Sequence, residues 1–368
     1  MTIQLVDLKK QYESIKVEID SVIAEVLAKT AFIGGSYVRD FEEAFASFCG
    51  ARHCIGVGNG TDAIFIALKC MGIGEGDEVI VPANSFIATA EAVTQTGARV
   101  VFADINPQTY NTDVAGIARR ISPQTKAIIP VHLYGQPAEM DPIMAVAREH
   151  GLKVIEDSAQ ALGATYHGTK VCAIGDVGCI SFFPSKNLGA FGDGGMLVTH
   201  DAQLAERMRM VAAHGSRVRY YHEILGVNSR LDTLQAAILL VKARHLDAWN
   251  AERRRAAGRY TAMLAGTPVT PPFIAPGREH IFHQYTVRAP RRDDLAARLK
   301  ERGIPHAIYY PVPLHLQQAF AMAGKKQGDF PVTEQATLEV LSLPMHTELN
   351  EEQQVFVCDT IREFYAGR

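Results

Sequence analysis

The sequence lacks the features that mark membrane and secreted proteins. Even a run of purely apolar residues such as 236–241, as long as any in the chain, is far too short to cross a bilayer. Residues 1–16 are amphipathic and charged, without the apolar stretch and small-residue cleavage site of a secretory leader. We therefore expect a protein that acts in the cytoplasm.

Cysteine pairs and an excess of charge of one sign are also missing. The six cysteines form no C-x-x-C pair and no zinc-ligand spacing, so we expect free thiols and no metal site. There are 37 basic and 40 acidic residues, which leaves a net charge of −3. Without a basic surface for nucleic acid or an anionic membrane, a small molecule is the expected partner.

The pattern of apolar segments predicts an α/β fold. Helix-length segments separate short β-rich runs, which favours a mainly parallel sheet with helices on both faces. The runs are apolar throughout, which is typical of strands buried on both sides. The expected strands are 78–81, 99–103, 127–131, 153–156, 178–183 and 195–199, and the expected helices between them include 62–71, 87–96 and 140–150.

The pattern changes past residue 246 and predicts a second, smaller α+β domain. We expect a division into residues 1–245 and 246–368, because the length of 368 residues also suggests two domains. The expected elements there are a helix at 251–265, a strand at 283–287, a helix at 293–302, a short strand at 307–310 and a closing helix at 351–365.

A glycine-rich turn, residues 56–62, opens the first of these helices. Glycines let the backbone approach an anion, and a helix N-terminus offers free N–H groups to it. The segment is neither a Walker A loop nor the dinucleotide fingerprint, because Thr61 stands where the third glycine would be. A turn with an ordinary Thr or Asp helix cap remains the alternative.

Two charged residues follow buried strands, at the edge where ligands of open α/β sheets bind. Asp157 ends the run 153–156 and needs a cationic or hydrogen-bonding partner, although a helix cap is the commoner role for such a residue. Lys186 lies in an apolar, glycine-flanked segment that would favour a nucleophilic amine, with a structural salt bridge as the alternative. Together with the anion-binding turn, these residues suit pyridoxal 5′-phosphate (PLP).

Over nearly its whole length the chain resembles the DegT/DnrJ/StrS family of nucleotide-sugar aminotransferases. The resemblance implies a fold type I aminotransferase, with a large PLP-binding domain around a mainly parallel seven-stranded sheet and a homodimer with shared active sites. The matching segments are GNGTDA (58–63), GDEVIVP (76–82), PVHLYGQPAEMD (130–141), VIEDSAQALGA (154–164), SFFPSKNLGAFGDGGM (181–196), GVNSRLDTLQAAIL (226–239) and YYPVPLHLQ (309–317).

The resemblance also implies roles for individual residues. Lys186 matches the lysine that binds PLP covalently, Asp157 the partner of the pyridine nitrogen, and Gln160 a neighbour of the 3-hydroxyl. Phe86 stands where the family stacks an aromatic side chain on the ring, although read alone it would be a core residue. The expected phosphate contacts are Gly60, Thr61, Ser181 and, from the partner subunit, Asn228.

The reaction that the resemblance implies moves the amino group of L-glutamate to a keto sugar linked to a nucleotide. The segment 214–230 resembles members that aminate 3-keto sugars, such as those forming dTDP-3-amino-3,6-dideoxyhexoses or UDP-2,3-diamino-glucuronate. Several 3-keto relatives have His-Tyr-Pro where this chain has Tyr309-Tyr310-Pro311, and tyrosine where it has Phe183. A UDP-linked 3-keto-glucuronate and a 4-keto sugar therefore stay as alternative substrates. A non-catalytic PLP-binding regulator stays as the alternative function. The expected substrate contacts are Arg219, Arg230, Tyr309, Tyr310 and His315.

Overall fold

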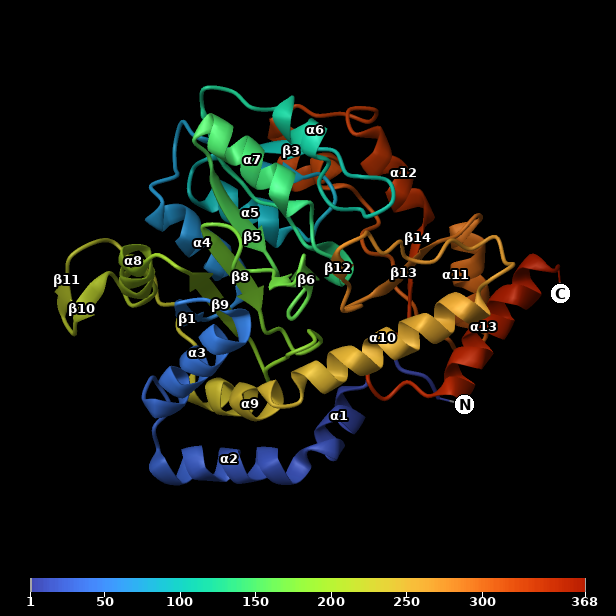
Figure 1. Ribbon diagram of the computed structural model, residues 1–368, viewed down its shortest axis with the longest axis horizontal. Coiled ribbons are helices and arrows are strands. Elements are labelled where there is room, and N and C mark those ends of the chain that lie inside the picture. The colour runs from blue at the N-terminus through green and yellow to red at the C-terminus, as the bar shows by residue number, and fades with distance from the viewer. Residues whose placement is uncertain (1, 368) are drawn as a thin grey trace.

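A seven-stranded sheet forms the centre of the molecule in a computed structural model that describes residues 2–367 (Figure 1). Four neighbouring pairs of strands are parallel, and only β9 runs against both of its neighbours. This confirms the expected mainly parallel sheet. In spatial order the strands are β1 (His53–Val57), β9 (Gly195–Thr199), β8 (Val177–Ser181), β5 (Lys153–Asp157), β4 (Thr125–Ile128), β2 (Glu78–Pro82) and β3 (Arg99–Ala103).

Both faces of the sheet are buried, as the apolar strands predicted. In β2, Val79 and Val81 pack on one side with α4 (Gly60–Cys70) and α5 (Ala88–Gln95), whereas Ile80 packs on the other with α7 (Met140–His150). This alternation follows from the two-residue period of a strand. The remaining helices of the first 245 residues are α1 (Leu8–Ser14), α2 (Lys16–Lys29), α3 (Ser36–Cys49), α6 (Val114–Ala118), α8 (Ala202–Ala212) and α9 (Thr233–Ala243).

A second core follows the long helix α10 (Leu246–Met263), which crosses the lower part of Figure 1. There β13 (Tyr285–Arg288) pairs antiparallel with β14 (Val340–Leu343), and α11 (Arg292–Glu301) and α13 (Glu351–Tyr365) pack beside them. Ile3 from the start of the chain also packs in this core. The division at residues 245 and 246 stays a prediction, and the N-terminal segment contributes to both parts.

Several expected segments differ from the structure. The first buried helix begins at Gly60, because the Asn59 side chain accepts a hydrogen bond from the Asp62 N–H at 2.8 Å and caps it. Strand β1 was not expected from the sequence. The expected strand at 307–310 is wrong, because only Ala307 pairs there, with Ser342. Helix α12 (Pro331–Glu339) also lies outside the expected elements.

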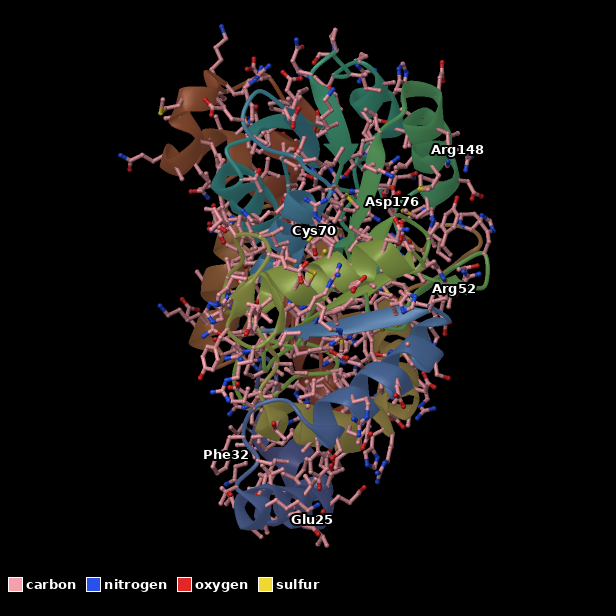
Figure 2. The ribbon with its side chains drawn as sticks, turned by 90° about the vertical axis from the view of Figure 1, so that its left-hand side faces the viewer. Glu25, Phe32, Arg52, Cys70, Arg148 and Asp176 are labelled. Carbon is pink, nitrogen blue, oxygen red and sulfur yellow. The ribbon has the colours of Figure 1, made fainter. Side chains whose placement is uncertain are left out.

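The N-terminal helices form one end of the molecule. Figure 2 shows Glu25 on α2 and Phe32 at this end, and Arg148 on α7 at the opposite end. All six cysteines are buried free thiols, as expected. Within residues 2–367 no helix is both long and apolar enough to span a membrane, and no cluster of three metal-ligating side chains is present.

A buried carboxylate fixes the loop between β7 (Thr169–Lys170) and β8. Glu156 is fully buried and accepts hydrogen bonds from the backbone N–H groups of Cys172, Ile174 and Gly175, at 2.7–3.0 Å. His132 Nε2 is 3.0 Å from the carboxylate and must donate, because its Nδ1 already accepts from the Ala138 N–H. Burial alone would raise the pKa of Glu156, but these donors outweigh it and hold the pKa below its usual range.

We predict that Glu156→Gln lowers the free energy of unfolding at neutral pH by about 2–4 kcal/mol, because an amide cannot accept all four donors. Because the pKa of Glu156 is lower in the folded state, its ionised carboxylate stabilises the fold at pH values above the pKa in the unfolded state. This contribution is lost as the pH falls through the folded-state pKa. The difference between wild type and variant, measured by urea denaturation, should therefore shrink below about pH 4. Glu43→Gln, an exposed change on α3, is the control. Equal stability of the wild type and Glu156→Gln would contradict this account.

Candidate active site

A cavity of about 940 Å³ lies at the carboxyl edge of the central sheet, between the two cores. The segments after β1, β2, β5 and β8 reach it, because parallel strands end at the same edge. Residues of the second core, including Ser342 and Leu343 of β14, line the other side. The expected site residues that line this cavity are Gly60, Thr61, Phe86, Asp157, Gln160, Ser181, Lys186, Tyr309 and Tyr310.

The N-terminus of α4 forms one wall and can bind an anion. The first N–H groups of a helix have no partner within the helix, and here those of Gly60 and Thr61 lie at the cavity. Gly60 is packed so tightly on Ser181 that a Cβ atom on it would lie 2.8 Å from the Ser181 Cβ. Only glycine therefore allows the helix end and the end of β8 to approach this closely.

Asp157 is held as a carboxylate at the end of β5. Its Oδ2 accepts a hydrogen bond of 2.7 Å from the Thr89 hydroxyl, and its Oδ1 accepts one of 3.2 Å from the Ala159 N–H. Because the Thr89 proton is used there, the Ser85 hydroxyl must be the donor in its 2.7 Å bond to Thr89. These donors compensate for burial and leave a negative charge beside the cavity.

Lys186 follows β8 and faces the same cavity. Burial lowers the pKa of its amine to about 8, while the charge of Asp157 acts in the opposite direction. About a tenth of the amine is then unprotonated at pH 7, far more than for an ordinary lysine, and this is the state that attacks a carbonyl. The alternative of a structural salt bridge is not what the structure shows, because within residues 2–367 Lys186 forms no ion pair, and the charge of Asp157 acts on it only at a distance.

Gln160 and Tyr310 form a polar pair on the opposite wall. The Gln160 Oε1 accepts from the Tyr134 N–H at 2.7 Å, and its Nε2 donates to the Tyr310 hydroxyl at 2.9 Å. The Tyr310 proton is thus free for a ligand. Burial raises the pKa of Tyr310 well above its usual value, so it stays a phenol. Phe86 lies beside it, with ring centroids 6.1 Å apart, and is 54% exposed rather than part of the core.

Four expected site residues do not reach this cavity within a single chain. Asn228, Arg219 and Arg230 are exposed, and Arg219 lies next to the hairpin of β10 (Ser216–Val218) and β11 (Tyr221–His222) at the far left of Figure 1. His315 has a fully buried side chain that bonds Glu334 at 3.0 Å and packs on Phe330. The expectation that His315 contacts a sugar is corrected, because a core position leaves no surface for it.

Other residues of the cavity were not expected from the sequence. Thr89, which is buried and bonds Asp157 without lining the cavity itself, has no recognisable motif, since a threonine in the first turn of a helix is common. His283 was expected only as the first residue of the strand 283–287, and it lies just before β13 in the structure. Residues 4–6 come from the start of the chain, far from the other site segments in sequence. Only the folded chain brings them together.

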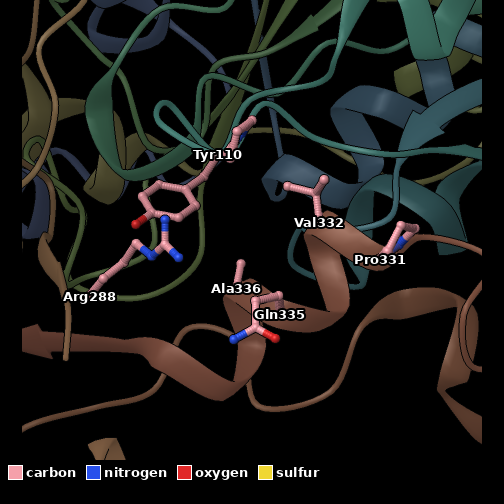
Figure 3. Close-up of a pocket in the computed structure, with 7 residues that line it drawn as sticks. Tyr110, Arg288, Pro331, Val332, Gln335 and Ala336 are labelled. Atoms are coloured by element: carbon pink, nitrogen blue, oxygen red, sulfur yellow. The ribbon is translucent and has the colours of Figure 1, made fainter. Parts of the chain in front are cut away.

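A second hollow, of about 240 Å³, lies between the loop after β3 and α12 (Figure 3). Tyr110 and Arg288 point into it, together with apolar side chains of α12. Arg288 already donates to the Glu339 carboxylate, with its Nε 2.7 Å from Oε2. This hollow lacks an unpaired charge and does not resemble a catalytic site.

Comparison with known proteins shows the family. A model of the DegT/DnrJ/EryC1/StrS aminotransferase family matches residues 13–362. The chain belongs to this family. It is 53% identical to the pleiotropic regulatory protein of Geobacillus stearothermophilus, over 99% of each chain. It is 48% identical to the UDP-N-acetyl-3-dehydro-α-D-glucosamine 3-aminotransferase of Acidithiobacillus ferrooxidans, over 99% of this chain and 98% of that one.

The fold comparison agrees with this family. The crystal structure of S. venezuelae DesV in complex with a ketimine intermediate has a TM-score of 0.97 and 43% identity, covering 99% of this chain and 98% of that one. The chain is therefore a PLP-dependent aminotransferase. Its cavity fits the cofactor, since it offers a helix N-terminus for the phosphate, a carboxylate for the ring nitrogen and an amine of lowered pKa for the aldehyde.

We predict that Gly60→Ala weakens PLP binding by about ten-fold. The added Cβ atom would collide with Ser181, and relieving that collision costs about 1–3 kcal/mol and moves the N-terminus of α4. Absorbance titration of the apoprotein with PLP measures the change. Gly258→Ala is the matched control, because a Cβ atom there meets nothing within 4 Å. Unchanged affinity of Gly60→Ala would show that the phosphate binds elsewhere.

Proposed function

We propose that this aminotransferase moves the amino group of L-glutamate to the 3-keto group of a nucleotide-linked sugar. The observation that carries the proposal is that two side chains line the same cavity: the Lys186 amine, whose pKa is lowered, and the buried Asp157 carboxylate. The Acidithiobacillus relative, which is named for a 3-dehydro sugar, supports the choice of C3. The favoured substrate is a dTDP-linked 3-keto-6-deoxyhexose.

Six residues of the cavity have roles in this reaction. When bound, PLP supplies an aldehyde that condenses with amines and a ring that withdraws electrons. Asp157 balances a positive charge on the ring nitrogen, Phe86 covers the ring, and Gly60, Thr61 and Ser181 hold the phosphate. Lys186 Nζ takes a proton from the α-carbon of glutamate and, in the second half, gives one to the carbon of the sugar carbonyl.

The sugar would lie against the two tyrosines. Tyr310 has a hydroxyl proton free to donate, and Tyr309 lines the cavity beside it. Phe183, 52% exposed at the same cavity, adds an apolar contact where relatives have tyrosine. This wall differs from that of the 3-keto relatives, so UDP-2-acetamido-3-keto-glucuronate and 4-keto sugars are the substrates to compare.

Electrostatics support a homodimer with shared sites. Lys186 is the only lysine or arginine among residues 2–367 that lines the cavity, whereas Asp62, Asp157 and Asp193 all do. Glutamate, the cofactor phosphate and the sugar diphosphate are all anionic and need cations. We propose that Asn228, Arg219 and Arg230 of the partner subunit complete the site. The hairpin of β10 and β11, which carries Arg219 in its turn and precedes the other two, and the segment after it expose apolar side chains: Val218, Tyr220, Tyr221 and Leu225.

The setting of the reaction is a proposal as well. Six buried free thiols fit the reducing cytoplasm. The amino sugar would be used in surface polysaccharide, such as O-antigen, rather than in a glycosylated natural product. A non-catalytic regulator remains the alternative, which the name of the Geobacillus relative makes worth testing.

We predict two half-reactions. L-glutamate should convert the cofactor to its pyridoxamine form, and a dTDP-linked 3-keto-6-deoxyhexose should restore the original absorbance, because each substrate reverses the change that the other makes. Stopped-flow absorbance follows both steps, with Lys186→Ala as the inactive control. Restoration only by the 3-keto-glucuronate or a 4-keto sugar would replace the proposed substrate, and no reaction with any amino donor would favour a regulator.

We also predict complementation between two inactive variants. Lys186→Ala and Asn228→Ala should each abolish or strongly lower activity, because one removes the amine and the other a phosphate contact from the partner. When the two are co-expressed, about half of the dimers are mixed and carry one intact site, so about a quarter of the wild-type activity should return. The absence of any recovery would place Asn228 in its own chain's site.

A further inference from the structure

Lys242 is a buried cation without a counter-ion. It lies on α9 with only 1% of its surface exposed, and within residues 2–367 it forms no ion pair. Its Nζ donates a hydrogen bond of 2.5 Å to the carbonyl oxygen of Gly189. The rings of Phe191 and Trp249 also face the ammonium, with centroids 5.2 and 6.0 Å from Nζ. Neither the proposed reaction nor the cavity uses this residue.

A buried cation of this kind lowers the stability of the fold. The aromatic rings compensate only in part for the lost water, because burial still lowers the pKa of Lys242 to about 8. The cost is present at pH values below this folded-state pKa, and it vanishes as the pH rises above the unfolded-state pKa. Replacing a buried charge by an apolar side chain of similar size is often neutral or stabilising. The advantage of Lys242 must therefore lie in the group that it binds.

That group belongs to the loop that carries Lys186. The loop turns back on itself after β8, and the Ala190 N–H donates to the Phe182 carbonyl at 2.7 Å. Gly189 is pressed against Pro184, so that a Cβ atom on it would lie 2.1 Å from the Pro184 carbonyl oxygen. Lys186 lies inside this closed turn. The position of the Gly189 backbone therefore determines where the Lys186 backbone lies.

Helix α9 holds the same loop at a second point. Gln235 Oε1 accepts from the Phe191 N–H at 2.8 Å, and Gln235 Nε2 donates to the Phe191 carbonyl at 3.2 Å. Gln235 and Lys242 are about two helical turns apart, so both lie on one face of α9. The helix itself packs on α2 and α3. The loop is thus fastened to a firmly packed part of the molecule.

We propose that Lys242 is a positioning residue for Lys186: its ammonium holds the Gly189 carbonyl and so fixes the backbone from which the reactive amine extends. A charged donor holds a carbonyl more firmly than a neutral one does. The backbone must stay in place while the Lys186 side chain is released from the cofactor and bound again. This role rests on the proposed function, in which Lys186 is the reactive amine, and the lower stability is retained for the sake of that function.

The test compares Lys242→Met with the wild type in two measurements. Methionine has a similar length and lacks the ammonium. After removal of PLP, the midpoint of urea denaturation at pH 7 should be equal to that of the wild type or higher, because an unpaired buried charge is lost. The rate at which Lys186 reacts with added PLP should nevertheless fall about ten-fold, because the amine is less well placed. Absorbance follows this reaction, and borohydride trapping with mass spectrometry locates it at Lys186.

Lys69→Met is the matched control. Lys69 also lies over an aromatic ring, with its Nζ 5.9 Å from the Phe65 centroid, but it belongs to the last turn of α4. It does not line the cavity, so the rate of the Lys186 reaction should stay at the wild-type value.

The two measurements separate a positioning role from a structural one. An unchanged or faster Lys186 reaction in Lys242→Met would overturn the proposal, because the loop would not need the ammonium. A denaturation midpoint below that of the wild type, or a variant that does not fold, would also overturn it, because Lys242 would then act through the stability of the fold. Failure of wild-type Lys186 to react with PLP would instead overturn the proposed active site.

Discussion

Taking a carboxylate and an amine out of water is costly, and this fold does both at one edge of its central sheet. Asp157 ends β5 and Lys186 follows β8, two strands that pair in parallel and so deliver both side chains to the same cavity. Hydrogen bonds from Thr89 and Ala159 satisfy the carboxyl oxygens, whereas burial pushes the amine toward its neutral form. The chemistry of the cavity depends on this unequal treatment of the two charges.

Close packing of backbone supports that arrangement. A Cβ atom on Gly60 would collide with Ser181, and one on Gly195 would lie 2.3 Å from the Asn59 carbonyl oxygen. The start of α4 is thereby pressed against the ends of β8 and β9, which aims its free N–H groups at the cavity. Deeper in the molecule, Glu156 ties the 172–175 loop to His132. A rigid scaffold thus surrounds a site whose reactive amine must be able to move.

A single chain nevertheless leaves the cavity short of positive charge. Its own residues supply three aspartates and one lysine, although every expected ligand is anionic. The arginines that the family resemblance assigns to substrate lie exposed near a projecting hairpin with an apolar surface.

The sequence by itself determined the fold class and the main chemistry. Apolar strands, the glycine-rich turn, Asp157 and Lys186 could be read directly, because strand period, backbone freedom and charge are local properties. Nine of the thirteen expected site residues line the cavity, and Phe86 is a cavity residue where its type alone suggested core. Tertiary structure decided the rest. It placed His315 in the core, set Thr89 against Asp157, and brought His283 and residues 4–6 to the cavity. These outcomes depend on contacts between segments far apart in the chain, for which no local pattern exists.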